Sequence, residues 1–194
     1  MKLIGLTGGV ACGKTTVAEQ LAKHGYPVID TDVIARELLT QENLVQAEVQ
    51  KLFGTLNRSQ IRSMVFGNAA KRRKLEEILH PKIAAEVQWR LKEIEKRKPT
   101  PQIAIVVIPL LYETGWENKV DKVIAVVSDE AAQIQRLTAR DHISNDLAKK
   151  MVESQLPNSE KSRRATYVIE NNSTPSTLAG KVDELIPQFL DKQI

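Results

Sequence analysis

Short apolar runs alternate with helix-like segments at both ends of the chain. Runs at residues 3–6, 26–29, 103–108, 120–127 and 167–169 predict strands, since continuous apolar runs are typical of strands covered on both faces. Apolar residues recur at helical spacing over residues 14–24, and Gly25 stands where a glycine often ends a helix. Two more helices are predicted over residues 129–156, and a last one over residues 175–190, whose end Pro187 weakens. This alternation predicts a parallel α/β core.

The middle of the chain follows a different pattern. Residues 36–98 are helical in pattern, rich in Lys, Arg, Glu and Gln, and contain no convincing strand. Pro81 is expected at the first position of a helix. The segment Lys98-Pro99-Thr100-Pro101 marks a boundary. We therefore expect a core over residues 1–35 and 100–194, and a helical insertion over residues 36–99.

Composition and charge narrow the functional class. The 194 residues carry a formal charge of +4, which suits an anionic ligand, and only 4% are aromatic, too few for a base-stacking surface. The single cysteine, Cys12, excludes an internal disulfide. The longest apolar stretch, residues 103–112, contains Pro109 and is much shorter than the ~20 residues that span a membrane. The N-terminal residues do not resemble a signal peptide. We expect a cytoplasmic protein without nucleic-acid or membrane partners, and a monomer is favoured.

Residues 8–15 read Gly-Gly-Val-Ala-Cys-Gly-Lys-Thr and fit the phosphate-loop pattern G-x-x-x-x-G-K-[ST]. Glycines let the backbone turn its N–H groups toward a phosphate, and the following helix directs its positive end to the same place. Lys14 is expected to bridge the β- and γ-phosphates, and the Thr15 hydroxyl to bind Mg²⁺. The predicted ATP-binding residues of this segment are Gly8, Gly9, Ala11, Cys12, Gly13, Lys14, Thr15 and Thr16. Cys12 is either a reactive thiol or, as we favour, a small residue that fits the loop.

A second nucleotide motif is rejected. Asn118-Lys119-Val120-Asp121 fits N-K-x-D, which reads guanine in GTPases. There the motif follows a strand, but here it precedes the predicted strand at residues 120–127. It therefore lies at the opposite edge of the sheet, and we do not expect a GTPase.

Two carboxylates follow the second predicted strand. In parallel sheets, ligands gather where strands end. Asp32 is expected either to accept a proton from an attacking hydroxyl or to help hold Mg²⁺, although it could also cap the next helix. For Asp30 we favour the helix cap.

Basic residues occur at several places. Arg136 and Arg140 lie four residues apart on one predicted helix face. We interpret this helix as part of a lid, whose two arginines stabilise the negative charge of the phosphates. The alternative is a solvated basic face. The clusters Lys71-Arg72-Arg73-Lys74 and Lys161-Ser162-Arg163-Arg164 are interpreted as solvated helix faces rather than nucleic-acid sites. His80 is, on the residues alone, a structural residue or cap.

Together these pieces resemble the dephospho-CoA kinase family, and the likeness covers essentially the whole chain. The phosphate loop is shared with many kinases, whereas the order of the other segments is far more specific. The matching segments are Gly5-Leu6-Thr7-Gly8-Gly9 through Thr16, Tyr26-Pro27-Val28-Ile29-Asp30-Thr31-Asp32 with Ile34-Ala35-Arg36, Leu79-His80-Pro81, Pro109-Leu110-Leu111-Tyr112-Glu113, Arg136-Leu137 with Arg140-Asp141, and Val168-Ile169-Glu170-Asn171.

The resemblance implies a P-loop NTPase core with a five-stranded parallel sheet, a helical substrate-binding insertion and a helical lid at about residues 130–156. It implies transfer of the ATP γ-phosphate to the ribose 3′-hydroxyl of dephospho-CoA, with ATP and Mg²⁺ as cofactors. The implied catalytic residues are Asp32, Lys14 and Arg140. Arg136 and Asn171 join the ATP-binding residues, and the substrate-binding residues are Asp32, Arg36, His80, Leu111 and Glu113.

The chain departs from the family at three places. The segment between Gly54 and Leu56 is short, Thr166 stands where Asp is common, and Val107 stands near a common strand Asp. The last difference leaves Thr15, Asp32, phosphates and water as metal ligands. Two rival functions stay open: a kinase for another small hydroxyl compound such as a nucleoside monophosphate, and a non-enzymatic nucleotide-binding regulator.

Overall fold

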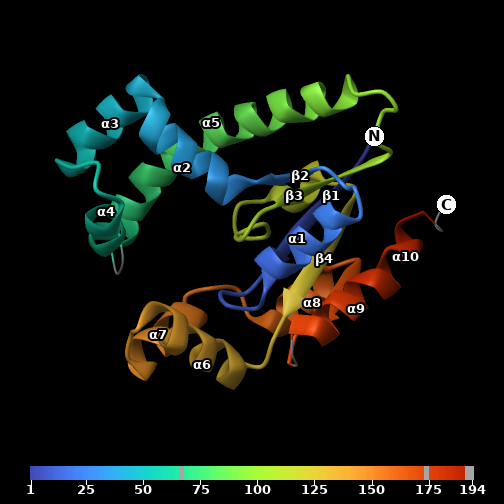
Figure 1. Ribbon diagram of the computed structural model, residues 1–194. Coiled ribbons are helices and arrows are strands. Elements are labelled where there is room, and N and C mark those ends of the chain that lie inside the picture. The colour runs from blue at the N-terminus through green and yellow to red at the C-terminus, as the bar shows by residue number, and fades with distance from the viewer. Residues whose placement is uncertain (66–67, 173–174, 191–194) are drawn as a thin grey trace. The chain divides into compact units, whose positions relative to one another are not determined.

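The chain divides into two compact units. A computed structural model describes residues 1–65, 68–172 and 175–190 (Figure 1). The first unit comprises Met1–Ile29 and Lys98–Ile194, and the second comprises Asp30–Arg97. The expected assignment of the second unit to substrate binding stays a prediction.

The first unit contains a five-stranded sheet with the order β2-β3-β1-β4-β5. β1 pairs in parallel with β3 and with β4, and β4 pairs in parallel with β5. All five residues of β3 are buried, which agrees with its continuous apolar run. The strands are β1 (Lys2–Gly8), β2 (Val28–Asp30), β3 (Ile103–Val107), β4 (Lys122–Val127) and β5 (Tyr167–Glu170). The predicted α/β fold with a five-stranded parallel sheet is confirmed, and β4 begins two residues later than its apolar run suggested.

Helices pack on this sheet, and α1 lies beside α9 (Figure 1). Apolar residues of both helices and of the central strands form one core, in which Val17, Leu21, Ile105 and Val182 are buried. Pro187 separates α9 from α10, so the predicted last helix is two helices. The helical elements of this unit are α1 (Lys14–Lys23), the 3₁₀ helix η1 (Trp116–Lys119), α6 (Glu130–Asp141), α7 (Asn145–Glu153), α8 (Asn158–Arg164), α9 (Pro175–Leu185) and α10 (Pro187–Leu190).

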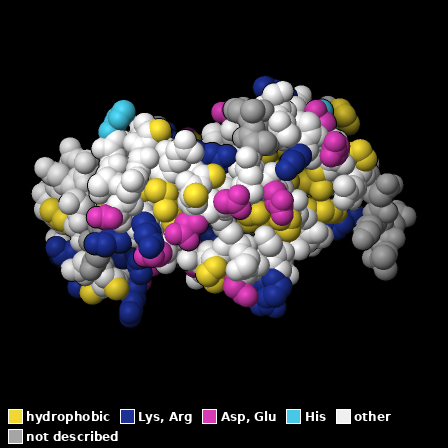
Figure 2. All heavy atoms as spheres, turned by 90° about the horizontal axis from the view of Figure 1, so that it is seen from below, with side chains coloured by type: hydrophobic (Ala, Val, Ile, Leu, Met, Phe, Trp, Pro, Cys, Tyr) yellow, Lys and Arg dark blue, Asp and Glu magenta, His cyan; other side chains and the backbone are white. Residues whose placement is uncertain are grey.

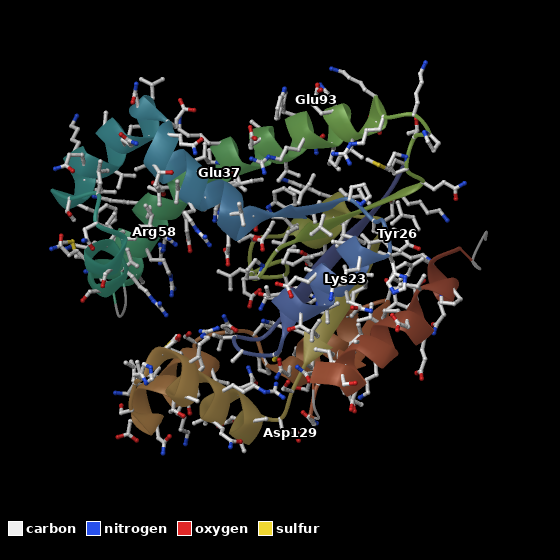
Figure 3. All side chains as sticks on the ribbon, in the orientation of Figure 1. Lys23, Tyr26, Glu37, Arg58, Glu93 and Asp129 are labelled. Atoms are coloured by element: carbon white, nitrogen blue, oxygen red, sulfur yellow. The ribbon has the colours of Figure 1, made fainter. Side chains whose placement is uncertain are left out.

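The second unit is helical over its described residues, as its pattern predicted. Its helices are α2 (Thr31–Gln41), α3 (Asn43–Phe53), α4 (Arg58–Val65) and α5 (Ala69–Glu95). Val45, Val49, Ile61 and Leu79 form a small core of their own. Glu37 of α2, labelled in Figure 3, pairs with Arg90 of α5 and ties these two helices together.

The expected helix start at Pro81 is wrong, because Pro81 lies inside α5. A proline there removes one backbone hydrogen bond but does not end a helix that neighbouring packing holds. Leu79 precedes it, and Val87, Leu91 and Ile94 follow it on the buried face. Burial on both sides of Pro81 therefore keeps the helix continuous.

Charged side chains of both signs are interspersed on the face shown in Figure 2, with hydrophobic side chains between them. Such mixing is typical of solvated helix faces. Within the described part of the chain, each helix is too short or too polar to cross a bilayer.

Candidate active site

The turn between β1 and α1 has a backbone that requires glycine at two points. A Cβ on Gly8 would lie 2.1 Å from the Val126 carbonyl oxygen, and a Cβ on Gly13 would lie 2.4 Å from the Asn171 amide nitrogen. Gly13 also has a φ of +94° and directly precedes α1. The predicted context of a strand, a glycine-rich loop and a helix is therefore confirmed.

Three successive carbonyl groups of the loop accept hydrogen bonds from side chains of other elements. Gln133 Nε2 donates to Val10 O at 2.7 Å, Arg136 Nη1 to Ala11 O at 3.3 Å, and Asn171 Nδ2 to Cys12 O at 2.9 Å. Ala11 adopts a left-handed φ of +57° between them. Alternating backbone conformations of this kind turn successive N–H groups to one side, where they form an anion site. The carbonyl groups are thus held by the flanking helix and strand end.

The charged and hydroxyl side chains of the loop lie where α1 begins. Lys14 Nζ donates to Gly8 O at 2.8 Å and to Gly9 O at 3.0 Å, so its ammonium group lies over the loop. Thr15 is exposed and Thr16 is half-buried. The first turn of a helix attracts anions, because its N–H groups point out of the helix end. Cys12 is fully buried, which agrees with a small residue that fits the loop.

The two arginines of α6 have different surroundings. Arg136 Nη1 also donates to Ser128 Oγ at 3.0 Å, and Nη2 donates to Asn171 O at 2.8 Å. Arg140 is exposed, and its Nε and Nη2 donate to the two carboxylate oxygens of Asp141 at 2.7 and 2.8 Å. These hydrogen bonds raise the pKa of the Arg140 guanidinium above its ordinary value. The structure therefore brings Arg136 to the phosphate loop, and it places Arg140 one helical turn away in a pair with Asp141.

Both ends of the α6–α7 segment are fastened near the loop. Asp129, labelled in Figure 3, precedes α6. Asn158 Nδ2 donates to Ser128 O at 2.7 Å, which joins the residues before α6 to those after α7. Gln155 Oε1 accepts a hydrogen bond from Val10 N at 2.8 Å. The segment predicted to be a lid is therefore anchored to the phosphate loop at its base.

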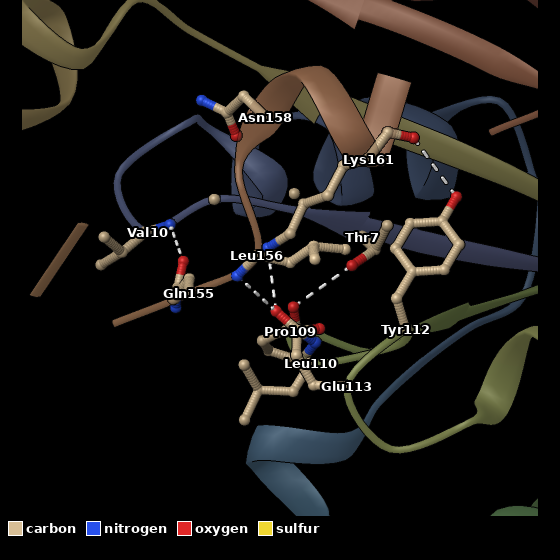
Figure 4. Close-up of polar contacts among 12 residues, drawn as sticks. Thr7, Val10, Pro109, Leu110, Tyr112, Glu113, Gln155, Leu156, Asn158 and Lys161 are labelled. Atoms are coloured by element: carbon tan, nitrogen blue, oxygen red, sulfur yellow. Dashed lines mark hydrogen bonds and ion pairs between the residues drawn. The ribbon is translucent and has the colours of Figure 1, made fainter. Parts of the chain in front are cut away.

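The segment after β3 lies beside the loop and α8. Thr7 Oγ1 donates to Pro109 O at 3.2 Å (Figure 4). Leu111 is fully buried, and a Cβ on Gly5 would lie 2.6 Å from its Cδ1 atom. The structure thus places Leu111 in the core, and its role in substrate binding stays a prediction. Glu113 Oε1 accepts a hydrogen bond from Leu156 N at 3.1 Å.

The remaining predicted residues belong to the helical unit. Asp30 Oδ1 accepts hydrogen bonds from Asp32 N at 2.8 Å and Val33 N at 3.4 Å, which confirms Asp30 as the helix cap. Asp32 and Arg36 are exposed on α2 and lie one turn apart on the same helix face. His80 is exposed on α5. The structure places Asp32 directly after the strand end, as predicted, and its role stays a prediction.

The N-K-x-D segment lies at the other edge of the sheet. Asn118 and Lys119 belong to η1, and Asp121 Oδ2 accepts a hydrogen bond from Leu3 N at 2.6 Å. Leu3 stands near the start of β1, whereas the phosphate loop follows the end of that strand. The position of this segment therefore agrees with the rejection of a guanine site.

The dephospho-CoA kinase family model matches residues 2–176. This chain belongs to the dephospho-CoA kinase family. A dephospho-CoA kinase of Fusobacterium nucleatum is 39% identical over 93% of this chain and 95% of its own length. Among solved structures, a Thermus thermophilus protein has a TM-score of 0.84 at 29% identity, with 98% of each chain covered. A dephospho-CoA kinase from Campylobacter jejuni has a TM-score of 0.68 at 27% identity, with 97% of this chain and 98% of that chain covered. The resemblance read from the sequence is confirmed.

Several polar residues of this dephospho-CoA kinase family member were missed from the sequence. Gln133 and Gln155 contact Val10 of the phosphate loop, and Asn158 contacts Ser128 before α6. Gln133 precedes Arg136 by three residues, so their shared helix face was a usable signal. Gln155 lies between α7 and α8, and Asn158 is the first residue of α8, so no local signal points to either residue.

The interpretation of residues 161–164 as a solvated basic face is wrong for Lys161. Its side chain is 0% exposed, whereas that of Arg163 on the same helix is 71% exposed. Position on one helix turn decides this difference, because Lys161 faces the protein interior and Arg163 faces solvent.

Proposed function

We propose that this protein transfers the γ-phosphate of ATP to the ribose 3′-hydroxyl of dephospho-CoA, giving CoA and ADP in the final step of coenzyme A biosynthesis. The observation that carries the proposal is a phosphate loop in which three carbonyl groups accept hydrogen bonds from side chains outside the loop. The family model, which matches residues 2–176, supports the same proposal. A fixed backbone can present its N–H groups to phosphate without reorganising during the reaction.

The ATP-binding residues in this proposal surround the start of α1. Backbone groups of the loop hold the phosphates, and Lys14 moves from its own loop carbonyls to the β- and γ-phosphates. Arg136 and Asn171 support the loop and border the nucleotide. The proposed ATP-binding residues are Gly8, Gly9, Ala11, Cys12, Gly13, Lys14, Thr15, Thr16, Arg136 and Asn171.

Asp32 and Arg140 have the proposed catalytic roles. Asp32 draws the proton from the 3′-hydroxyl, because a ribose hydroxyl is a weak nucleophile until a carboxylate orients and deprotonates it. Arg140 leaves its hydrogen bonds with Asp141 and stabilises the negative charge that develops on the transferred phosphoryl group. Arg36, His80, Leu111 and Glu113 complete the proposed acceptor-binding set.

The residues present fit a magnesium ion whose ligands are mostly phosphate oxygens of the nucleotide and water. Mg²⁺ prefers oxygen ligands and keeps several waters, and Thr15 offers an exposed hydroxyl at the start of α1. Among the described residues, no group of three or more His, Cys, Asp or Glu side chains could hold a metal by itself. When bound, the ion neutralises charge on the β- and γ-phosphates. Thr15 and Asp32 are the side chains that would hold it.

We further propose that the protein acts in the cytoplasm, as a monomer, on a small-molecule acceptor. The single cysteine agrees with a reducing compartment. The interspersed charges of Figure 2 suit a solvated surface better than a nucleic-acid surface.

The proposal is tested by measuring ADP release from ATP with four acceptors in parallel: dephospho-CoA, AMP, CMP and shikimate. We expect kcat/KM for dephospho-CoA to exceed the others by ~10³-fold or more, since unpaired polar groups penalise wrong acceptors. Faster turnover with a nucleoside monophosphate would support the rival kinase function. ATP binding without ADP release for any acceptor would support the non-enzymatic regulator.

A further inference from the structure

Lys161, on α8, has one of the largest fully buried side chains among the described residues. Burying an ammonium group costs much free energy unless a partner compensates it, and lysine is rarely found fully buried. The other basic residues of α8 follow the usual rule, since Arg163 is 71% and Arg164 is 35% exposed. The burial of Lys161 is therefore not a general property of this helix.

The Lys161 ammonium faces the carboxylate of Glu113. Nζ lies 3.4 Å from Glu113 Oε1, and the described residues provide it with no hydrogen-bond partner. The same Glu113 oxygen accepts the hydrogen bond of Leu156 N at 3.1 Å (Figure 4). The Glu113 side chain is 26% exposed, so its carboxylate contacts the buried Lys161 ammonium and also reaches the surface. The Lys161 main chain is held as well, because Tyr112 Oη donates to its carbonyl oxygen at 3.4 Å.

This pair connects three segments that matter for phosphoryl transfer. Glu113 lies in the segment that follows β3, and Leu156 follows the lid helix α7. The residue before Leu156 is Gln155, which accepts a hydrogen bond from Val10 of the phosphate loop. Lys161 therefore fixes Glu113 at the point where the end of the lid segment meets the loop.

Stability alone is a weak reason for such a pair. Replacing a buried ion pair by apolar groups of similar volume is often neutral or stabilising, whereas removing one partner leaves an uncompensated charge. The double substitution therefore distinguishes two roles of the pair. If the pair is purely structural, activity returns together with stability. If the pair orients a reacting group, activity does not return.

We propose that Lys161 is a positioning residue, whose buried ammonium holds the Glu113 carboxylate and the end of the lid segment in the geometry that the acceptor requires. The inference rests on the proposed function for Glu113 as an acceptor-binding residue. Lys161 acts through Glu113, so its loss affects use of the acceptor more than binding of ATP.

The test compares Lys161→Met, Glu113→Gln and the double variant, with Arg163→Met as the matched control on the exposed side of α8. We expect kcat/KM for the acceptor to fall by ~10- to 100-fold in both single variants, while the Kd for ATP changes by less than ~3-fold. The control should stay within ~2-fold of the original protein, since its ion pair with Glu160 is exposed.

The double variant separates positioning from folding. Glu113→Gln leaves the buried ammonium without its carboxylate, so adding Lys161→Met should raise the melting temperature above that of Glu113→Gln alone. Activity should not return with it, and the loss should be no larger than in either single variant. Recovery of activity together with stability would overturn the proposal, as would additive losses or normal acceptor kinetics in Glu113→Gln. The acceptor is whichever compound the ADP-release assay selects, so a failure of dephospho-CoA as substrate is seen separately in the unsubstituted protein.

Discussion

In the phosphate loop, the side chains of Gln133, Arg136 and Asn171 each donate to a loop carbonyl, and glycine alone fits at Gly8 and Gly13. In the helical unit, the predicted residues Asp32, Arg36 and His80 are exposed side chains on helices. In the first region the fold already holds the backbone in place, and we propose that this backbone binds the nucleotide. We propose that side chains of the second region contact the acceptor. We infer that substitutions in the first region act mainly on the nucleotide, and those in the second act mainly on the acceptor.

The largest effect is expected at Lys14. Lys14→Ala removes the charge that bridges the phosphates, so turnover should fall by ~10³-fold or more. Its melting temperature should change little, because Lys14 is only half-buried and its ammonium group donates to the carbonyl groups of Gly8 and Gly9 in the loop. Lys23→Ala, exposed at the other end of α1, is the control. Steady-state kinetics showing about a tenth of the original turnover in Lys14→Ala would refute its role, since one positioned donor is worth more than that.

The next effect is expected at Asp32. Asp32→Asn keeps size but removes the basic oxygen, so kcat should fall by roughly 10²–10⁴-fold, with ATP affinity measured without metal unchanged. Asp30→Asn is the control, because asparagine caps a helix about as well as aspartate. A Mg²⁺ titration separates the two possible roles: rescue by excess Mg²⁺ indicates a metal ligand, and no rescue indicates the base. Normal kcat at ordinary Mg²⁺ would leave Asp32 with neither role.

A smaller effect is expected at Arg140. If it meets transition-state charge, Arg140→Ala should lower kcat by ~10²-fold and change the Kd for ATP much less. Lys149→Ala on α7 is a matched exposed control, since its pair with Glu153 spans 3.8 Å. The comparison is made by single-turnover kinetics beside equilibrium ATP binding. Weaker ATP binding with an unchanged kcat would instead show that Arg140 binds ATP in the ground state.

The smallest effect is expected at Asn171. Asn171→Ala leaves the Cys12 carbonyl without its side-chain donor, so the Kd for ATP should rise about tenfold, with little change in KM for the acceptor. Asn118→Ala, exposed at the opposite edge of the sheet, should leave both constants unchanged. Calorimetric titration of ATP measures the difference. A change in acceptor KM alone would break the proposed division between the two regions.

The loop and the sheet could be predicted because their signals are local. The glycine spacing at residues 8–15 and the apolar run of β3 each depend on neighbouring residues only. The Asp30 cap was likewise readable from the residue type just before a helix.

The contacts that hold the loop could not be predicted, because they join residues far apart in the chain. Val10 and Gln155 are separated by 145 positions, and Glu113 and Leu156 by 43. Lys161 and Arg163 look alike in sequence, and only packing shows that one is buried and the other exposed. The prediction that a helix begins at Pro81 was wrong for a related reason, since the packing of buried residues on both sides of Pro81 keeps α5 continuous.

The product of the reaction tests the central claim most directly. Dephospho-CoA and ATP are incubated with the protein, and the product is analysed by mass spectrometry and phosphorus NMR. The account predicts CoA, with one new phosphomonoester at the ribose 3′ position, and an equal amount of ADP. ADP without CoA, or a new phosphate at another position, would contradict it.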